Sequence, residues 1–185
     1  MRLTNINKSE NKIYKNPLKG NIVDIAIPVY YGNIPQIEEG LKKQIEFYNK
    51  NLREYKWTIV LAINGPDKGI IKFAEGLSKR YKNVKYTYTK IQGKGAGIKH
   101  CWNESNADIV SYMDVDLATS IEKLPDLLKA ITDGNDLSLG SKYLPDSKIA
   151  RGIRGRGLIS KIYHTFFTKF ILSIKTSDVH CGFKA

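Results

Sequence analysis

Short apolar runs of strand length alternate with segments of helical spacing along this chain, and this alternation limits its fold more than any other feature. The strand-like runs are residues 21–30, 56–64, 83–89, 107–116 and 135–143. The helix-like segments between them are residues 34–52, 70–81, 93–105 and 120–132. Strands that alternate with helices of ten to fifteen residues predict an α/β fold with a mostly parallel sheet.

Length and composition predict one globular domain preceded by a polar arm. The chain has 185 residues, of which 42% are hydrophobic, enough for one sizeable core. Residues 1–20 are polar and lysine-rich, and the predicted domain is 21–185. No run approaches the roughly 18 apolar residues of a membrane span, and the start does not resemble a secretory signal. Cys101 and Cys181 are too few for a disulfide framework, so we expect small buried residues in a reducing compartment.

The net charge of +12 favours anionic partners, and much of it lies near the end of the chain. From Lys142 onward there are nine Lys or Arg and two acids, a net of +7. Nucleic acid, anionic lipid head groups and phosphorylated small molecules all suit this charge. Composition does not choose among them.

Turn residues and charged residues follow each predicted strand, in the motifs PVYYG, NGPD, GKG, DVD and GSK. Ligands of open α/β sheets bind at the carboxyl ends of the strands. These motifs should therefore gather at one edge of the sheet, which indicates an enzyme.

Two aspartates, Asp114 and Asp116, end the apolar run 107–116. Residues two apart in an extended segment point the same way, so both carboxylates can converge on one Mg²⁺ or Mn²⁺ ion. The alternative is that the acids cap the following helix, whose start we also expect Ser120 to cap.

The segment QGKGAGIK (92–99) places three glycines and two lysines at a predicted helix start. Backbone amides at such a start favour a phosphate, although the spacing of a Walker A loop is absent. The alternative is a simple flexible turn.

A basic, glycine-rich stretch runs from residue 140 to residue 161. Arg156 and Ser160 lie four apart and would share a helix face, where they could hold a phosphate; a solvated surface loop is the alternative. The apolar stripe at 159–170 suits either a core-facing helix or a basic amphipathic helix at a membrane surface.

Taken in order, these motifs resemble family 2 glycosyltransferases of the branch that makes dolichyl-phosphate glucose or mannose. The resemblance covers roughly residues 22–185. AIPVY is similar to the donor-base strand, NGPD to the second-strand turn, GKGAGIK to the phosphate-side loop and MDVDLAT to the DxD metal motif. GSKY, RGLIS and SDVHCGFKA are similar to the acceptor region. The implied fold is the nucleotide-diphospho-sugar transferase (GT-A) fold, an open, mostly parallel sheet flanked by helices.

On the donor side, the resemblance implies that Pro28 and Tyr30 flank the nucleotide base, with Asn64 nearby. Lys94 and Gly95 would bind the donor from the phosphate-side loop.

At the metal, the resemblance implies that Asp114 and Asp116 hold Mg²⁺ or Mn²⁺, with Val115 and Asp114 on the diphosphate and Asp116 as the catalytic residue. The residues implied to receive the lipid phosphate are Lys142, Arg156 and Ser160.

The implied activity is metal-assisted, inverting transfer of a sugar from a UDP-glucose or GDP-mannose type of donor to a polyprenyl or dolichyl phosphate. The implied location is cytoplasmic and peripheral, at the cytoplasmic face of a membrane. A phosphate acceptor is already an anionic nucleophile, so it needs positioning and charge neutralisation more than a general base.

The chain departs from the family pattern in its base-binding turns. Tyr31 and Gly32 stand where the family often has Asn-Glu, and Ile63 and Asn64 stand where it usually has Asp-Asp or Asn-Asn. Uridine and guanosine therefore both remain open. Ala118 replaces the glutamine that mannose-transferring relatives use near the metal, which favours a glucose-type or another kind of relative.

The chain also ends at Ala185, directly after CGFK, where relatives continue, so we expect a truncated domain. A rival hypothesis is a catalytically degenerate module that binds nucleotide or an anionic membrane surface. Nucleic acid is not an expected partner, because the aromatics near the basic stretch follow a helical stripe. A nucleotidyltransferase would carry its glycine-rich loop after the first strand, not near residue 93.

Overall fold

The computed structural model describes residues 21–30, 34–115, 117, 119–141 and 181–185. The chain divides into two compact units, residues 18–125 and residues 126–185 together with 1–17. Within the described part of the first unit, strands and helices alternate strictly. These elements are β1 (Ile22–Val29), α1 (Ile34–Asn51), β2 (Lys56–Asn64), α2 (Lys68–Arg80), β3 (Val84–Thr89), α3 (Lys94–Asn103) and β4 (Ile109–Met113). The predicted α/β alternation is confirmed over this whole unit.

The four strands of this unit form a parallel sheet in the order β3-β2-β1-β4. β1 lies between two partners, so that Ile25 pairs with Ile59 of β2 and with Ser111 of β4. Parallel strands require a crossover between them, and each crossover here is a helix. As a result, all four carboxyl ends lie at one edge of the sheet.

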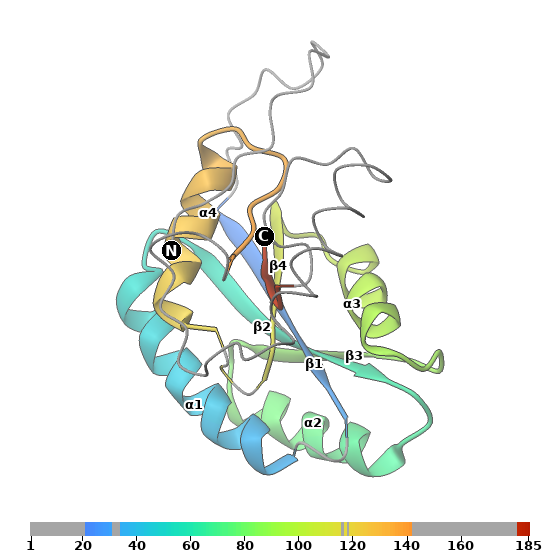
Figure 1. Ribbon diagram of the computed structural model, residues 1–185. Helices are drawn as coiled ribbons and strands as arrows, with labels where there is room; N and C mark the ends of the chain where they lie inside the picture. The colour runs from blue at the N-terminus through green and yellow to red at the C-terminus, as the bar shows by residue number, and fades with distance from the viewer. Residues whose placement is uncertain (1–20, 31–33, 116, 118, 142–180) are drawn as a thin grey trace, which may run out of the picture. The chain divides into compact units, whose positions relative to one another are not determined.

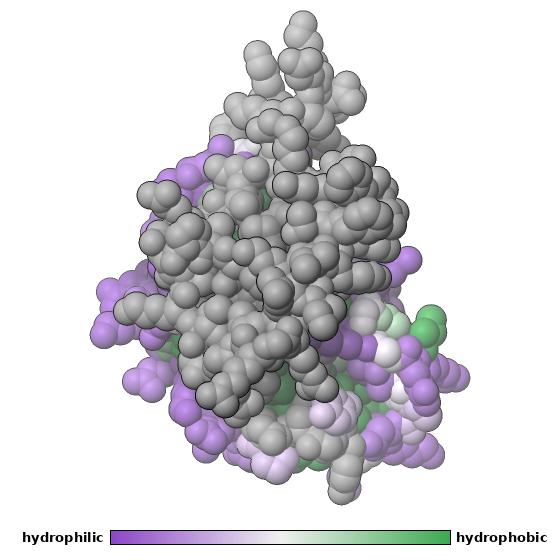
Figure 2. Space-filling model, in the orientation of Figure 1, coloured by the Kyte–Doolittle hydropathy of each residue, from purple (hydrophilic) through white to green (hydrophobic). Residues whose placement is uncertain are grey.

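Helices cover both faces of this sheet (Figure 1). On one face, Tyr48 of α1 packs its ring edge against Trp57 of β2, with ring centroids 5.4 Å apart. On the other, Trp102 of α3 lies against Tyr112 of β4 at 6.0 Å. Double coverage explains why the strands are nearly continuous apolar runs rather than alternating ones. The described residues at the margins of Figure 2 are mostly hydrophilic.

The turn after β2 begins the next helix by a local cap. Gly65 adopts a φ of +86°, which favours glycine, and the Asp67 carboxylate accepts hydrogen bonds from the Gly69 and Ile70 amides at 2.8 and 3.2 Å. An aspartate at this position satisfies amides that have no partner within the helix. The motif NGPD therefore forms a turn between β2 and α2, as predicted.

The segment 120–132 is not one helix capped by Ser120, which corrects the prediction. A 3-10 helix, η2 (Ile121–Lys123), precedes α4 (Leu124–Thr132). The Ser120 hydroxyl contacts the Glu122 carboxylate and makes no side-chain bond to a cap amide. Pro125 is the second residue of α4 and has no N–H to donate back to the preceding turn, which explains why the regular helix begins here and not at residue 121.

The strand predicted at 135–143 is also wrong over its described residues. Leu139 forms a single antiparallel bridge to Lys184, which belongs to the two-residue strand β5 (Phe183–Lys184). The Ser138 and Ala185 backbones exchange hydrogen bonds of 2.8 and 2.9 Å beside this bridge. Because β5 has only two residues, the segment around Leu139 forms one bridge and no longer strand.

The two cysteines differ in how deeply they are buried. Cys101 is 2% exposed on α3, within a cluster that includes Ala26 and Val60, as predicted, whereas Cys181 is half-buried. Burial raises the pKa of the Cys101 thiol from 9.0 to about 11. Within the described ranges, no helix combines the length and apolarity that a membrane crossing requires.

The raised pKa of Cys101 makes stability fall at high pH. Between about pH 9 and pH 11 the unfolded thiol loses its proton while the folded thiol keeps it, so unfolding is favoured. We expect the free energy of unfolding to fall by about 2 kcal/mol across this window, measured by urea titration at several pH values. The same series on Cys101→Ala isolates the thiol, and identical slopes in both proteins would contradict the assignment.

Candidate functional site

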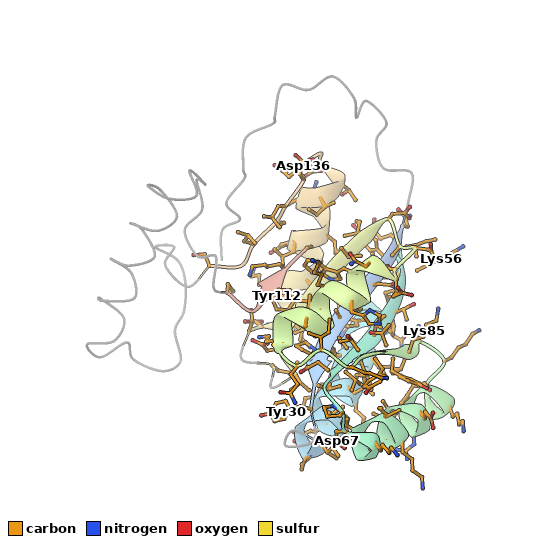
Figure 3. The ribbon with its side chains drawn as sticks, turned by 90° about the vertical axis from the view of Figure 1, so that its right-hand side faces the viewer. Tyr30, Lys56, Asp67, Lys85, Tyr112 and Asp136 are labelled. Atoms are coloured by element: carbon orange, nitrogen blue, oxygen red, sulfur yellow. The ribbon has the colours of Figure 1, made fainter. Side chains whose placement is uncertain are left out.

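The candidate site lies at the carboxyl edge of the parallel sheet. Tyr30 follows β1, Asn64 ends β2, and Asp114 follows β4. Figure 3 shows Tyr30 and Asp67 at this end of the sheet and Lys56 at the opposite end. The predicted gathering of strand-end motifs is therefore confirmed for these three strands, and the loop after β3 joins them through the contacts below.

Asn64 anchors the loop that leads into α3. Its Oδ1 accepts a hydrogen bond of 3.0 Å from the Gly93 amide. Gly93 adopts a φ of +118°, which favours glycine. A Cβ on Gly97 would lie 3.3 Å from the Ala62 carbonyl oxygen and 3.4 Å from the Asn64 Cβ. The first turn of α3 therefore packs directly on the end of β2.

An ion pair joins the start of α3 to the end of β4. The Lys94 ammonium contacts the Asp114 carboxylate, and the two side chains are 49% and 34% exposed. The same ammonium lies 5.5 Å from the centre of the Tyr112 ring, within cation–π range. Lys94 thus balances the charge of Asp114.

The other predicted donor-site residues differ in how accessible they are. Pro28 is buried within β1, whereas the Tyr30 side chain beyond it is 60% exposed. Val115 is half-buried. Gly95 is exposed in the first turn of α3, and a Cβ there would meet nothing within 4 Å. As far as the described residues go, the N-terminus of α3 therefore has open space beside Gly95, where a helix end favours an anion.

Asp114 has the chemistry of a ligand for a hard divalent cation. Mg²⁺ in particular is bound by one or two carboxylates together with substrate phosphates and water. Within the part of the chain that the structure describes, no group of three or more His, Cys, Asp or Glu side chains gathers. A carboxylate such as that of Asp114 can bind a cation that completes its coordination from diphosphate oxygens and water.

Four predicted site residues fall outside the described residues. They are the second aspartate of the pair and the three residues expected at the acceptor phosphate: Asp116, Lys142, Arg156 and Ser160. The apolar stripe at 159–170 also falls outside them. The alternative of Asp114 as a helix cap is not what the structure has, because its carboxylate pairs with Lys94.

Two features of the site were missed by sequence reasoning. The Lys94–Asp114 pair joins residues 20 apart, and the close seating of Gly97 depends on where β2 ends. GKGAGIK carried a partial signal, since small residues at a helix start permit close packing.

With this geometry in place, comparison with known proteins is informative. The family model for glycosyl transferase family 2 matches residues 24–185. The chain belongs to this family. The predicted family and fold class are thereby confirmed.

Three curated relatives have names that specify related activities. Glycosyltransferase AglD of Haloferax volcanii is 26% identical over 165 residues, covering 88% of this chain and 26% of the relative. Dolichol-phosphate mannosyltransferase of Pyrococcus furiosus is 29% identical over 140 residues, covering 75% and 38%. Polyprenol monophosphomannose synthase of Mycolicibacterium smegmatis is 33% identical over 77 residues, covering 42% and 29%. The chain thus matches well under half of each relative's length.

A solved structure supports the fold. The mannosyltransferase PcManGT of Pyrobaculum calidifontis, in complex with GDP-Man and Mn²⁺, has a TM-score of 0.50 and 18% identity. The match covers 69% of this chain and 37% of that one. At this identity the likeness shows the fold alone.

Asn64 provides a test of how the loop is anchored. Asn64→Ala keeps the Cβ that packs against Gly97 but removes the acceptor for the Gly93 amide. We expect the free energy of unfolding to fall by about 0.5 to 1 kcal/mol, since the exposed amide can turn to water instead. Urea titration measures this, and Asn64→Asp, which retains Oδ1, should lose less. Equal losses in both variants would contradict the anchoring role.

Proposed function

We propose that this chain carries the donor site of a hexosyltransferase that moves a sugar from a nucleoside diphosphate to a polyprenyl phosphate. The observation that carries the proposal is the Lys94–Asp114 pair at the carboxyl edge, next to the N-terminus of α3. The pair supports the proposal because a carboxylate that can bind a metal lies with two anion-attracting groups, the Lys94 ammonium and the start of α3, where open α/β sheets bind their ligands. The names of the family 2 relatives agree with this activity.

Under this proposal, each residue of the candidate site that the structure describes takes part in donor binding. Asp114 holds a divalent cation, Mg²⁺ or Mn²⁺, and Lys94 turns from Asp114 to the diphosphate when the donor binds. Tyr30 and Asn64 contact the nucleoside from the ends of β1 and β2. The backbone amides beside the exposed Gly95 donate hydrogen bonds to phosphate oxygens of the donor.

Pro28 and Val115 support this arrangement from the ends of β1 and β4. Three further residues, proposed from sequence, receive the acceptor phosphate: Lys142, Arg156 and Ser160. Asp116 is proposed as the second metal ligand and the catalytic residue.

The reaction proposed is a direct displacement with inversion at the anomeric carbon. An acceptor phosphate oxygen attacks the carbon from the face opposite the nucleoside diphosphate, which departs. A divalent cation, when bound, would neutralise the negative charge that develops on this leaving group. The acceptor is already anionic, so the protein's part is to position it and balance its charge. The proposed setting is the cytoplasmic face of a membrane, where such lipids are accessible.

A degenerate module that binds nucleotide without transferring sugar is the second candidate. It is favoured by Tyr31 and Gly32, which stand where relatives often have an Asn-Glu pair that can contact the nucleoside. Such a module would bind nucleotide sugars but would neither hydrolyse nor transfer them.

Donor binding is the decisive experiment. Isothermal titration of UDP-glucose and GDP-mannose, with and without Mn²⁺, should show binding of one donor that depends on the metal. We expect Asp114→Ala and Asp116→Ala each to weaken it at least roughly tenfold, because a divalent site loses a carboxylate ligand.

Glu46→Gln is the matched control, because it removes one negative charge from an exposed position on α1. It should bind the donor as the unmodified chain does. If a folded chain binds neither donor, the transferase proposal fails for this chain. Binding without metal-dependent release of sugar would identify the degenerate module.

Lys94 should act in opposite directions on the metal and on the diphosphate. Lys94→Met leaves Asp114 without its counter-charge, so Mn²⁺ alone should bind roughly two- to fivefold more tightly. Mn²⁺ with UDP or GDP should bind more weakly, because a cation that faces the diphosphate is lost. Lys99→Met, on an exposed position of the same helix, should change neither affinity. Changes of the same sign for metal and nucleotide would argue against this exchange of partners.

A further inference from the structure

Helix α1 touches the loop after β4 at a glycine. A Cβ on Gly40 would lie 2.9 Å from the Val115 carbonyl oxygen and 3.9 Å from the Leu117 Cγ. The first of these distances is shorter than real side chains tolerate, so the loop can occupy its position only because residue 40 has no side chain. Glycine weakens a helix interior relative to alanine, so this close approach has a cost in the helix.

The same face of α1 brackets Asp114. Gly40, Gln44 and Tyr48 are spaced four apart and share one side of the helix. Gly40 meets Val115, which follows Asp114, while the Tyr48 hydroxyl donates to the Met113 sulfur at 3.0 Å, which precedes it. The helix therefore contacts the chain on both sides of the proposed metal ligand.

Gln44 lies between these two contacts and is fully buried. Neither its Oε1 nor its Nε2 has a hydrogen-bond partner within the described part of the chain. A buried amide without partners is costly and rare, and each case calls for an explanation. Its position one turn from both contacts places it at the level where β4 ends.

The loop itself is tightly turned. Leu117 has a φ of +52°, an unusual value for a residue with a branched side chain. Its amide reaches back to the Asp114 carbonyl oxygen over a long 3.4 Å. A turn with so weak an internal bond depends on its surroundings to hold its shape.

We propose that the Gly40–Gln44 face of α1 supports the described residues that follow β4, namely Asp114, Val115 and Leu117, and that it positions the Asp114 carboxylate for the metal and diphosphate. Gly40 sets how closely the loop approaches. Gln44 supplies hydrogen bonds to the loop backbone in the donor-bound form. Neither residue touches the donor, so both are positioning residues. The effect on metal and diphosphate binding rests on the proposed function. The contact between α1 and the residues that follow β4 does not.

Gly40→Ala tests the seating, with Gly76→Ala as its control. Gly76 is an exposed glycine inside α2 where a Cβ would meet nothing within 4 Å. Both changes add one methyl group to a helix interior, yet only the first should shift the amide NMR signals of residues 114, 115 and 117. The dissociation constant for Mn²⁺ with UDP or GDP should rise roughly tenfold or more in Gly40→Ala alone.

Gln44→Met separates a positioning role from a structural one. Methionine replaces an unpartnered amide by an apolar group of similar length, so the Tm of the free protein should rise. If Gln44 holds the loop in the bound form, Mn²⁺–nucleotide affinity should nevertheless fall severalfold. A higher Tm with unchanged affinity would remove Gln44 from the proposal.

The amide signals and the nucleotide affinities distinguish two kinds of failure. If the unmodified chain binds neither Mn²⁺–UDP nor Mn²⁺–GDP, the donor-site proposal fails, and the loop amides alone decide the seating. If these amides are unmoved in folded Gly40→Ala, the seating is overturned whatever the nucleotide result. Equal responses to Gly40→Ala and Gly76→Ala would overturn it as well.

Discussion

The parallel pairing of β1 with both β2 and β4 is the constraint on which the rest of this unit depends. A strand paired on both sides and covered on both faces must be apolar over most of its length, as the consecutive buried residues Ile25, Ala26 and Ile27 are. Parallel pairing also obliges every crossover to return over a face of the sheet. The loops that follow the strands then have one edge to share, and the polar chemistry collects there.

At that edge, the balance of charge is set by one pair. Lys94 approaches from the start of α3, whose backbone also presents partial positive charge, and Asp114 meets it from the end of β4. One carboxylate therefore faces two sources of positive potential. Under the proposed function, such a site would attract a diphosphate, and a divalent cation on Asp114 would free Lys94 to face it. The pairing keeps the carboxylate and the ammonium at the edge where the proposed donor site requires both.

Prediction from sequence succeeded where structure is local. The buried strands and the helices up to residue 113 follow from apolar periodicity, and the turn after β2 follows from the residues of NGPD. It failed where a distant partner decides. The pattern around Leu139 resembles a strand, but its partner β5 is only two residues long. The error at Ser120 has a local cause instead, because the neighbouring Glu122 carboxylate accepts from the Ser120 hydroxyl and Pro125 lies where a continuous helix needs an amide.

The candidate site shows the same contrast between what the sequence predicts and what it does not. Residue types and strand ends could be predicted, because carboxylates, glycines and lysines at a sheet edge have few other uses. The contacts that aim them could not, because they join residues far apart in the chain. Gly40 is the clearest case, since in the sequence it is only a weak point inside a helix, 75 positions before Val115. Its role arises from the distance between α1 and the end of β4. Where a backbone carbonyl must approach a helix this closely, the residue that positions the site is the one with no side chain to reveal it.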